Sequence, residues 1–406
     1  MRARDLNLIV VAVVALLAAG AMPPAAADPG PSQAPTETAM KQAMADAGDW
    51  MLGVVGTDGQ MTPPAGSPAW EGSSAGRLCL NGLALLRAYQ TTGDDRYLDR
   101  AVAAGDLVAS SVDAGSKYVI ERLNLLPTEA YGGFPDVQSG KVDDAYVASH
   151  SGNVDFKLWE TINGMWFLKE LHRETGDNNY INMAVLLDRL VSEQFYADED
   201  MGAGLYGSLS LSGTGTWSRS GRASMTHMGL LLHVITLGEQ DLVNLWRDRY
   251  SLVSFIRPQQ NGDGSFDDGF DLPSQDNQSE TKHAIMIPAL YDIGVPKEAA
   301  ALAEWVRSQQ RPDGHLACPH DKDPLGDTSV AAMGLLPVGE VSSGGDAVSW
   351  LLTQQETDGS WAAQSGLDIE STAMLSSQWA MLALHAGLTN YNLAIDGGAV
   401  ESAPVW

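Results

Sequence analysis

A pattern that occurs three times in the second half of the chain constrains the fold more than any other feature. An aromatic and an aliphatic residue are followed, after two variable positions, by Gln-Gln, two further residues, Asp-Gly and, two positions on, an apolar residue. The copies span 255–266, 305–316 and 350–361, so they recur at intervals of 50 and 45 residues. A period of this size is typical of architectures built from repeated supersecondary units.

Each copy has the composition of a helix end followed by a turn. We expect the aromatic and aliphatic pair to end an amphipathic helix, and the Gln-Gln amides to bond the last carbonyl groups of that helix. Asp-Gly supplies the turn, because glycine accepts a positive φ and Asp bonds its own following backbone. Acidic and hydroxyl residues that suit a helix start then follow, as in Asp327-Thr328.

Apolar helical stretches end at a glycine six times, which predicts six helical hairpins. The predicted stops are Gly93, Gly176, Gly238, Gly294, Gly339 and Gly387. Six helix pairs can close a ring of inner helices inside a ring of outer ones, so the expected fold class is all-α, an (α/α)6 toroid of six helical hairpins. The Gly- and Ser-rich stretch 202–220 is expected to form a long loop or a small hairpin within it.

These features resemble two groups of proteins that share the toroid. The Gln-Gln-x-x-Asp-Gly repeats are similar to the QW motif of the terpenoid cyclase/protein prenyltransferase superfamily, over roughly the last 150 residues. The helix starts after Gly93 and Gly176, each with Asp next and Tyr four positions on, look like those of six-hairpin carbohydrate enzymes such as glycosidases. Both resemblances imply the same ring, so they imply the fold more firmly than any function.

The first residues have the composition of a secretory signal. Arg2 and Arg4 precede an apolar stretch over 8–19 and the small residues of 25–27, and an uncleaved anchor is the alternative. We expect a signal peptide over 1–27, a flexible segment over 28–39, a single toroid domain over 40–395 and a tail over 396–406. We expect the mature protein to be a secreted monomer with no membrane association after signal removal.

The charge excludes one class of partner. The net charge of −27 would repel the phosphate backbone, so we expect no nucleic acid binding. Acid excess with only eight Lys suits a salt-rich habitat, and the ordinary acidity of a secreted protein is the alternative. The two cysteines, Cys79 and Cys318, either pair or remain buried thiols.

The starts of the inner helices are the expected site. In a closed toroid these starts meet at one end, so their positive poles converge and favour an anion. Cations and histidines gather near the starts of units two to four, whereas units five and six hold acids. The substrate-binding candidates are Lys157, Trp159, Trp217, Arg219, Arg222 and His227, and the catalytic candidates are Asp143, Asp155, Glu160, Lys282 and His283.

The leading hypothesis is an enzyme that acts on an anionic oligo- or polysaccharide, as a lyase or a glycoside hydrolase. In a lyase, Lys157 and Arg222 would neutralise the uronate carboxylate, and Lys282 or His283 would be the base if cationic neighbours lowered its pKa. In a hydrolase, Asp143, Asp155 and Glu160 are the candidates for the carboxyl pair.

Two other functions stay open. One is a secreted toroid that binds a ligand or protein without chemistry. The other is a terpenoid cyclase or prenyltransferase-like protein, although the acidic motif of terpene cyclases has only a partial match at 141–146, where Lys141 takes the place of its first Asp.

One loop is a candidate calcium site, and no cofactor is expected to be required. Asp263, Asp267, Asp268 and Asp271 place four carboxylates within nine residues, and carboxylate oxygens suit Ca²⁺. The loop lacks the ligand order of an EF-hand, and a turn-rich acidic loop is the alternative.

Overall fold

The computed structural model describes residues 35–65, 67, 74–129, 132, 152–198, 202–236, 252–266, 281–316, 323–362 and 372–395. Its α-helices are α2 (Glu37–Val54), α3 (Ala75–Thr92), α4 (Asp95–Leu123), α6 (Leu158–Thr175), α7 (Asn178–Gln194), α8 (Met225–Thr236), α10 (Ile287–Asp292), α11 (Pro296–Ser308), α12 (Pro324–Leu335), α13 (Val341–Thr353) and α14 (Ala373–Ile395). The 3-10 helices are η2 (Pro127–Glu129), η4 (Arg257–Gln259), η5 (Thr281–Met286) and η6 (Leu336–Val338). Helix α2 begins within the segment 28–39 that the sequence predicts to be flexible.

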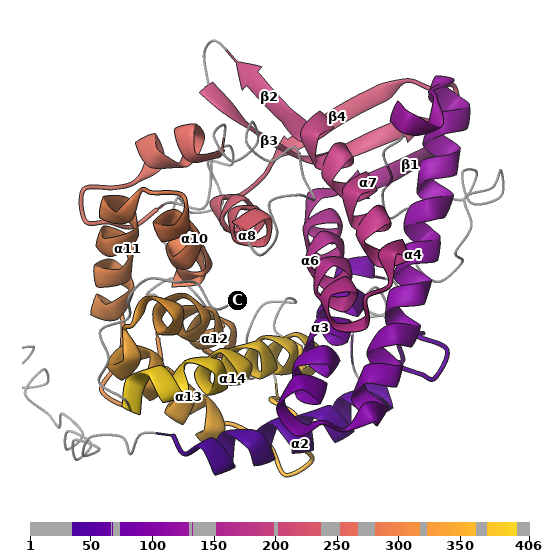
Figure 1. Ribbon diagram of the computed structural model, residues 1–406. Coiled ribbons are helices and arrows are strands. Elements are labelled where there is room, and N and C mark those ends of the chain that lie inside the picture. The colour runs from indigo at the N-terminus through magenta and orange to yellow at the C-terminus, as the bar shows by residue number, and fades with distance from the viewer. Residues whose placement is uncertain are drawn as a thin grey trace, which may run out of the picture.

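The helices form the predicted toroid (Figure 1). Along the inner ring α3 packs on α6, α6 on α8, α8 on η5, η5 on α12 and α12 on α14, and α14 returns to contact α3. Helices α2, α4, α7, α11 and α13 pack outside this ring, each against an inner helix. Most of the buried apolar side chains form one large cluster that runs from Met40 to Leu384, so α2 and α14 share a core.

Four of the predicted glycine stops are confirmed. Gly93, Gly176, Gly294 and Gly339 have φ between 72° and 84° just after a helix, which L side chains adopt only with strain. Gly238 lies outside the described residues. Gly387 is not a stop, because α14 continues to Ile395; a Cβ at Gly387 would lie 3.0 Å from Met40 Sδ, so this glycine permits close helix packing instead.

The Gln-Gln pairs stand at the ends of their helices, as predicted, but the amide of the second Gln joins neighbouring units instead of bonding the last carbonyl groups of its own helix. The Nε2 of the second Gln donates to the carbonyl of the turn glycine and to a carbonyl in the next outer helix: Gln260 to Gly264 and Glu298, Gln310 to Gly314 and Ser343, Gln355 to Gly359 and Ala43. The last of these bonds reaches α2, the first outer helix, and so helps to close the ring.

The turn glycines are seated on the same outer helices. A Cβ at Gly264, Gly314 or Gly359 would lie 2.3 Å from a carbonyl oxygen, of Ala301, Asp346 and Asp46 respectively. Only glycine fits such a contact, and its φ is positive at all three positions.

The structure contains a fourth copy of the repeat, at 50–61, that the sequence pattern did not predict. Gly59 has φ 78° and meets Ala103 O of α4 at the same 2.3 Å, and Val55 pairs with Met61 as Gln260 pairs with Phe266. Val55 stands where the other copies have the second Gln. The missing amide is replaced by Arg100 of α4, whose Nη1 donates to Val55 O at 2.6 Å.

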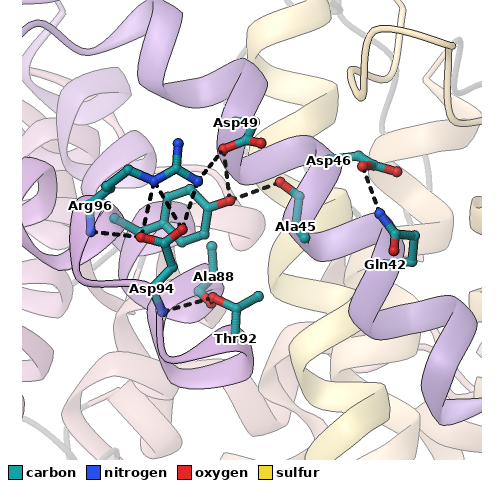
Figure 2. A network of polar contacts seen from close by, with 9 residues as sticks. Gln42, Ala45, Asp46, Asp49, Ala88, Thr92, Asp94 and Arg96 are labelled. Carbon is teal, nitrogen blue, oxygen red and sulfur yellow. Dashed lines mark hydrogen bonds and ion pairs between the residues drawn. The ribbon is translucent and has the colours of Figure 1, made fainter.

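At the predicted helix starts after Gly93 and Gly176, a tyrosine hydroxyl, and not a turn glycine, contacts the preceding outer helix. Tyr97 Oη lies 3.0 Å from Asp49 Oδ1 and from Ala45 O of α2, and Tyr180 Oη lies 2.8 Å from Asp106 Oδ1 of α4. Arg96 bonds both Asp94, the N-cap of α4, and Asp49 (Figure 2). Burial and the neighbouring carboxylate raise the pKa of both tyrosines, so each hydroxyl stays protonated as a donor.

Residues 202–220 form the predicted small hairpin, extended to a four-stranded antiparallel sheet. Its strands are β1 (Asn153–Lys157), β2 (Phe195–Asp198), β3 (Gly202–Ser212) and β4 (Trp217–Arg222), and β3 pairs with the other three. One face packs on α4 and α7 through a separate apolar cluster that includes Tyr118, Phe156, Leu190 and Leu209.

Candidate functional site at the inner-helix starts

Contacts between the helix starts show that the inner helices begin at one end of the ring, which we call the mouth. Glu160 of α6 reaches Gly76 of α3, and Trp159 of α6 reaches His227 of α8. Lys282 of η5 reaches Asp323 and Asp327 at the start of α12, and Gln378 of α14 reaches Arg77 of α3. The predicted convergence of positive helix poles therefore occurs here.

Glu160 is held at the start of α3. The backbone N–H of Gly76 donates to Glu160 Oε2, and Ser74 Oγ, which also caps α3, lies 3.4 Å from Oε1. Burial raises the pKa of this carboxyl above its ordinary value, although the Gly76 bond and the charges of Lys157 and Arg77 oppose the shift. A carboxyl with a raised pKa is suited to donate a proton.

An aromatic pair lies beside this carboxyl. Trp159 is half-buried, and its ring centroid is 5.6 Å from that of His227, at an angle of 51°. A Cβ at Gly76 would lie 2.7 Å from Trp159 Nε1, so glycine is needed there to seat the indole. Lys157 precedes α6 and is exposed. The structure thus brings together four of the predicted residues: Lys157, Trp159, Glu160 and His227.

The two candidate bases of a lyase lie in unsuitable surroundings. The two carboxylates 3.8 Å from Lys282 Nζ, of Asp323 and Asp327, are the opposite of the cationic neighbours that the base hypothesis required. His283 is fully buried, edge-on to Phe266 at 6.1 Å. In the other two repeats the residue after the turn bonds a hydroxyl of the next inner helix, Leu316 N to Thr328 Oγ1 and Trp361 N to Ser377 Oγ.

Four of the predicted residues belong to the sheet and not to helix starts. Trp217, Arg219 and Arg222 lie on β4, and Trp217 packs on Phe156 at 5.9 Å within the apolar cluster of the sheet. Asp155 lies on β1, exposed, and accepts a bond from Ser210 Oγ. Sequence proximity to α6 and α8 misled the prediction, because β1 and β4 lead directly into those helices.

Asp263 is the one residue of the predicted calcium site that lies within the described residues, and its carboxylate is used by a turn. Asp263 Oδ1 accepts from Ser265 N at 3.0 Å and from Ser265 Oγ at 2.6 Å, which lowers the pKa of Asp263, and Asp358 makes the same bonds with Ser360. Asp263 therefore shapes the repeat turn. Asp143, Asp267, Asp268, Asp271 and Cys318 lie outside the described residues, and Cys79 is a buried free thiol whose pKa is raised by burial.

The described part of the chain contains no group of three or more His, Cys, Asp or Glu side chains placed to hold a metal ion. None of its helices combines the length and the apolarity that crossing a membrane requires.

The interior of the ring holds residues that the sequence analysis missed. Trp166 of α6 and Trp379 of α14 are 2% and 7% exposed, and their ring centroids are 6.5 Å apart. The signal for them was the spacing on α6, where Trp159, Asn163, Trp166 and Glu170 follow one another at four, three and four residues and so share a face.

A buried ion cluster lies at the far end of the inner helices. Glu170 Oε2 is 2.7 Å from Arg87, its Oε1 is 2.8 Å from Arg173, and Lys169 Nζ donates to Val234 O at 2.9 Å. Burial disfavours ionisation of Glu170, yet the two arginines hold its pKa below the ordinary value. Burial lowers the pKa of the adjacent His233 to about 4, so it is neutral at pH 7.

Comparison with known proteins supports the fold. No family model matches the chain, and no curated protein matches its sequence. Among solved structures, a sugar epimerase from a ruminal bacterium is 13% identical over 90% of this chain and 100% of its own, with a TM-score of 0.57.

Two further structures resemble the toroid to a similar degree. A family 88 glycosyl hydrolase from Bacteroides vulgatus is 10% identical over 87% of this chain and 99% of its own, with a TM-score of 0.54. A type II terpene cyclase from Scytonema is 13% identical over the same shares, with a TM-score of 0.51. The chain therefore has the α/α-toroid fold that glycosidases, sugar epimerases and terpene cyclases share.

Proposed function

We propose that this protein is a secreted glycoside hydrolase that acts on an acidic oligosaccharide at the mouth. The observation that carries the proposal is the grouping of Trp159, His227, Glu160 and Lys157 at the starts of α6 and α8. An indole face stacks on a sugar ring, and a partly buried carboxyl beside it protonates the glycosidic oxygen.

Glu160 is the proposed general acid. Its raised pKa keeps a proton on the carboxyl at a pH where an ordinary Glu is ionised. Hydrolysis needs a second carboxyl, and Asp143 is the candidate that the sequence supplies for it. A hydrolase is preferred to a lyase because His283 is buried and carboxylates contact Lys282.

Lys157 is the proposed source of the preference for acidic sugars. It is exposed at the start of α6, where the helix pole adds to its charge, in a protein whose net charge is −27. A uronate carboxylate would bind at Lys157, where the local charge is positive although the protein as a whole is negative.

The test is the release of reducing ends from acidic and neutral oligosaccharides by the wild type and two variants. Glu160→Gln should lower kcat by about 10²–10⁴ with little change in binding, which calorimetry checks. Lys157→Ala should weaken binding of acidic oligosaccharides and leave neutral ones unchanged. Equal cleavage by wild type and Glu160→Gln would remove Glu160 from the chemistry.

A binding protein without chemistry is the second candidate. The observation that favours it is that both oxygens of Glu160 lie within reach of donors at the start of α3, as in a helix cap. In that case oligosaccharides bind to the wild type, no reducing ends appear, and Glu160→Gln mainly lowers stability.

A further inference from the structure

Helix α6 carries two glutamates whose partners differ in kind. Glu160 is partly exposed at the mouth, whereas Glu170 is 2% exposed at the far end of the same helix. Arg87 and Arg173 each bond one oxygen of Glu170. A guanidinium only donates, so both oxygens of Glu170 have to accept and the carboxylate stays ionised. Glu170 is therefore a structural ion, and it is the reference against which Glu160 can be judged.

The two oxygens of Glu160 have unequal partners. Oε2 accepts from the backbone N–H of Gly76, a group that cannot accept in return. A proton on Oε2 would point at that N–H, so the proton of the neutral carboxyl has to lie on Oε1. Ser74 Oγ is 3.4 Å from Oε1. A hydroxyl both donates and accepts, so Ser74 suits Oε1 when Glu160 is protonated and also when it is ionised.

The surroundings of Glu160 hold the carboxyl between its two forms. Burial raises its pKa, and the bonds from Gly76 and Ser74 and the charges of Lys157 and Arg77 act in the opposite direction. Of the other titratable neighbours, the thiol of Cys79 on α3 stays protonated because burial raises its pKa, and His227 of α8 packs on Trp159. The carboxyl can therefore hold a proton, and groups that stabilise the anion are in place when the proton leaves.

Gly76 also fixes the carboxyl relative to the indole. A Cβ at this position would lie 2.7 Å from Trp159 Nε1 and 3.3 Å from Glu160 Oε2, so the backbone of α3 lies close to both side chains. The start of α3, and not α6 alone, therefore sets the position of the proton relative to a sugar ring stacked on Trp159.

We propose that Ser74 is a positioning residue for the general acid and that Oε1 of Glu160 delivers the proton. This inference rests on the proposed function and gives the geometry of its acid. The proton passes from Oε1 to the glycosidic oxygen while the bond from that oxygen to the anomeric carbon breaks and its electron pair moves to the oxygen. Water adds to the anomeric carbon and gives its proton to the second carboxyl. The Ser74 hydroxyl then donates to Oε1, which carries the new negative charge.

The first measurement follows the ionisation of Glu160 itself, by carbon-13 NMR of the full chain with labelled glutamate carboxyls. Glu160→Gln identifies the signal. Ser74→Ala removes a bond that favours the anion, so the signal should titrate at higher pH than in the wild type. Ser74→Thr keeps the hydroxyl and should restore the wild-type titration.

A matched variant controls for the loss of a helix cap. Ser74 Oγ accepts from Arg77 N at the start of α3, and Thr36 Oγ1 accepts in the same way from Ala39 N at the start of α2. Thr36→Ala should therefore lower Tm, as Ser74→Ala does, and leave the titration of Glu160 unchanged.

The second measurement is the release of reducing ends from oligogalacturonates and hyaluronan oligosaccharides across the pH range in which the chain is folded. A general acid acts only while protonated, so activity is lost as pH rises through the pKa of Glu160. Ser74→Ala should move this loss to higher pH. It should also lower kcat roughly threefold to tenfold with KM unchanged, because the anion formed at Oε1 loses a hydrogen bond.

The outcomes separate the two proposals. If Ser74→Ala titrates and cleaves like the wild type while Glu160→Gln is inactive, the role of Ser74 is wrong and the proposed function stands. A lower kcat with an unshifted titration would mean that Ser74 acts only as the cap of α3, which also overturns the inference. If the wild type cleaves none of the acidic oligosaccharides, the proposed function is wrong, and the NMR titration alone decides whether Ser74 controls the proton on Glu160.

Discussion

The two halves of the ring join neighbouring outer helices in different ways. In the C-terminal half, an Asp-Gly turn is seated on the next outer helix and a Gln amide bonds a carbonyl three residues earlier, as for Gly314 with Gln310. In the N-terminal half, a tyrosine in the first turn of an outer helix bonds an Asp of the preceding outer helix, as Tyr180 bonds Asp106.

The first unit shows which part of the junction is essential. Its turn at Gly59 has the same seat on α4, yet it has no Gln, and Arg100 donates in the opposite direction to Val55 O. The glycine contact is therefore common to both halves, whereas the polar bond varies in donor and direction. Close backbone approach fixes the junction, and the side chains that satisfy the nearby carbonyls are interchangeable.

The largest expected effect on stability tests whether the glycine contact matters more than the polar bond. Gly359→Ala and Gly59→Ala should each cost about 3 kcal/mol or more in free energy of unfolding, because the new Cβ meets a carbonyl oxygen and φ is positive. Gly93→Ala, which also has positive φ but open space around it, should cost only about 1 kcal/mol. Urea unfolding of the three variants checks this, and equal costs would contradict the seating argument.

Acid should next destabilise the buried ion cluster around His233. The pKa of His233 is about 4 in the folded chain and near 6.5 when unfolded, so below pH 6.5 the unfolded chain binds the extra proton. Stability should fall by about 3 kcal/mol between pH 6.5 and pH 4 through this residue, and full stability is present above pH 6.5.

Hydrogen exchange at pH 4.5 provides the measurement for the acid effect. Amides of α6 and α8 should lose protection before those of α11 and α13, which hold no part of the ion cluster. The variant His233→Gln should have a weaker pH dependence than the wild type. A wild type whose unfolding midpoint in urea is the same at pH 7 and pH 4.5 would show that His233 titrates normally.

The Gln bond should have an intermediate effect. Gln355→Leu removes the amide that bonds both Gly359 O and Ala43 O, and about 1–2 kcal/mol should be lost. The control is the adjacent Gln354→Leu, because among the described residues the Gln354 amide bonds Thr353 Oγ1 alone, and its loss should cost little. If both variants unfold at the same urea concentration, the repeat glutamines do not contribute to ring closure.

The smallest expected effect concerns the tyrosines. Tyr97→Phe keeps the ring packed on Gly48 and removes only the hydroxyl near Asp49, so about 1 kcal/mol should be lost. Tyr89→Phe is the control, because the Tyr89 hydroxyl makes no hydrogen bond with the described residues. Thermal unfolding that ranks Tyr97→Phe with the control would mean that the N-terminal junction depends on packing alone.

The sequence by itself determined the ring fold and the positions of its turns and helix ends. The period of the repeats, the Asp-Gly turns and the stops at Gly93, Gly176, Gly294 and Gly339 follow from backbone preferences that act over a few residues. The copy at 50–61 was missed because Val54 and Val55 stand where the other copies have Gln-Gln. The contact of its turn glycine, Gly59, with the next outer helix is the same as in the other copies, but that contact is with a distant part of the chain.

Only the tertiary structure decided which side chains meet. Glu160 contacts Gly76, 84 residues earlier in the chain, and Trp166 meets Trp379 across the interior. Trp217 and Arg219 were placed at a helix start from sequence proximity, but strand pairing draws them into the sheet. Such contacts depend on the rotation of each helix about its axis and on the packing of all six units together, which local sequence does not specify.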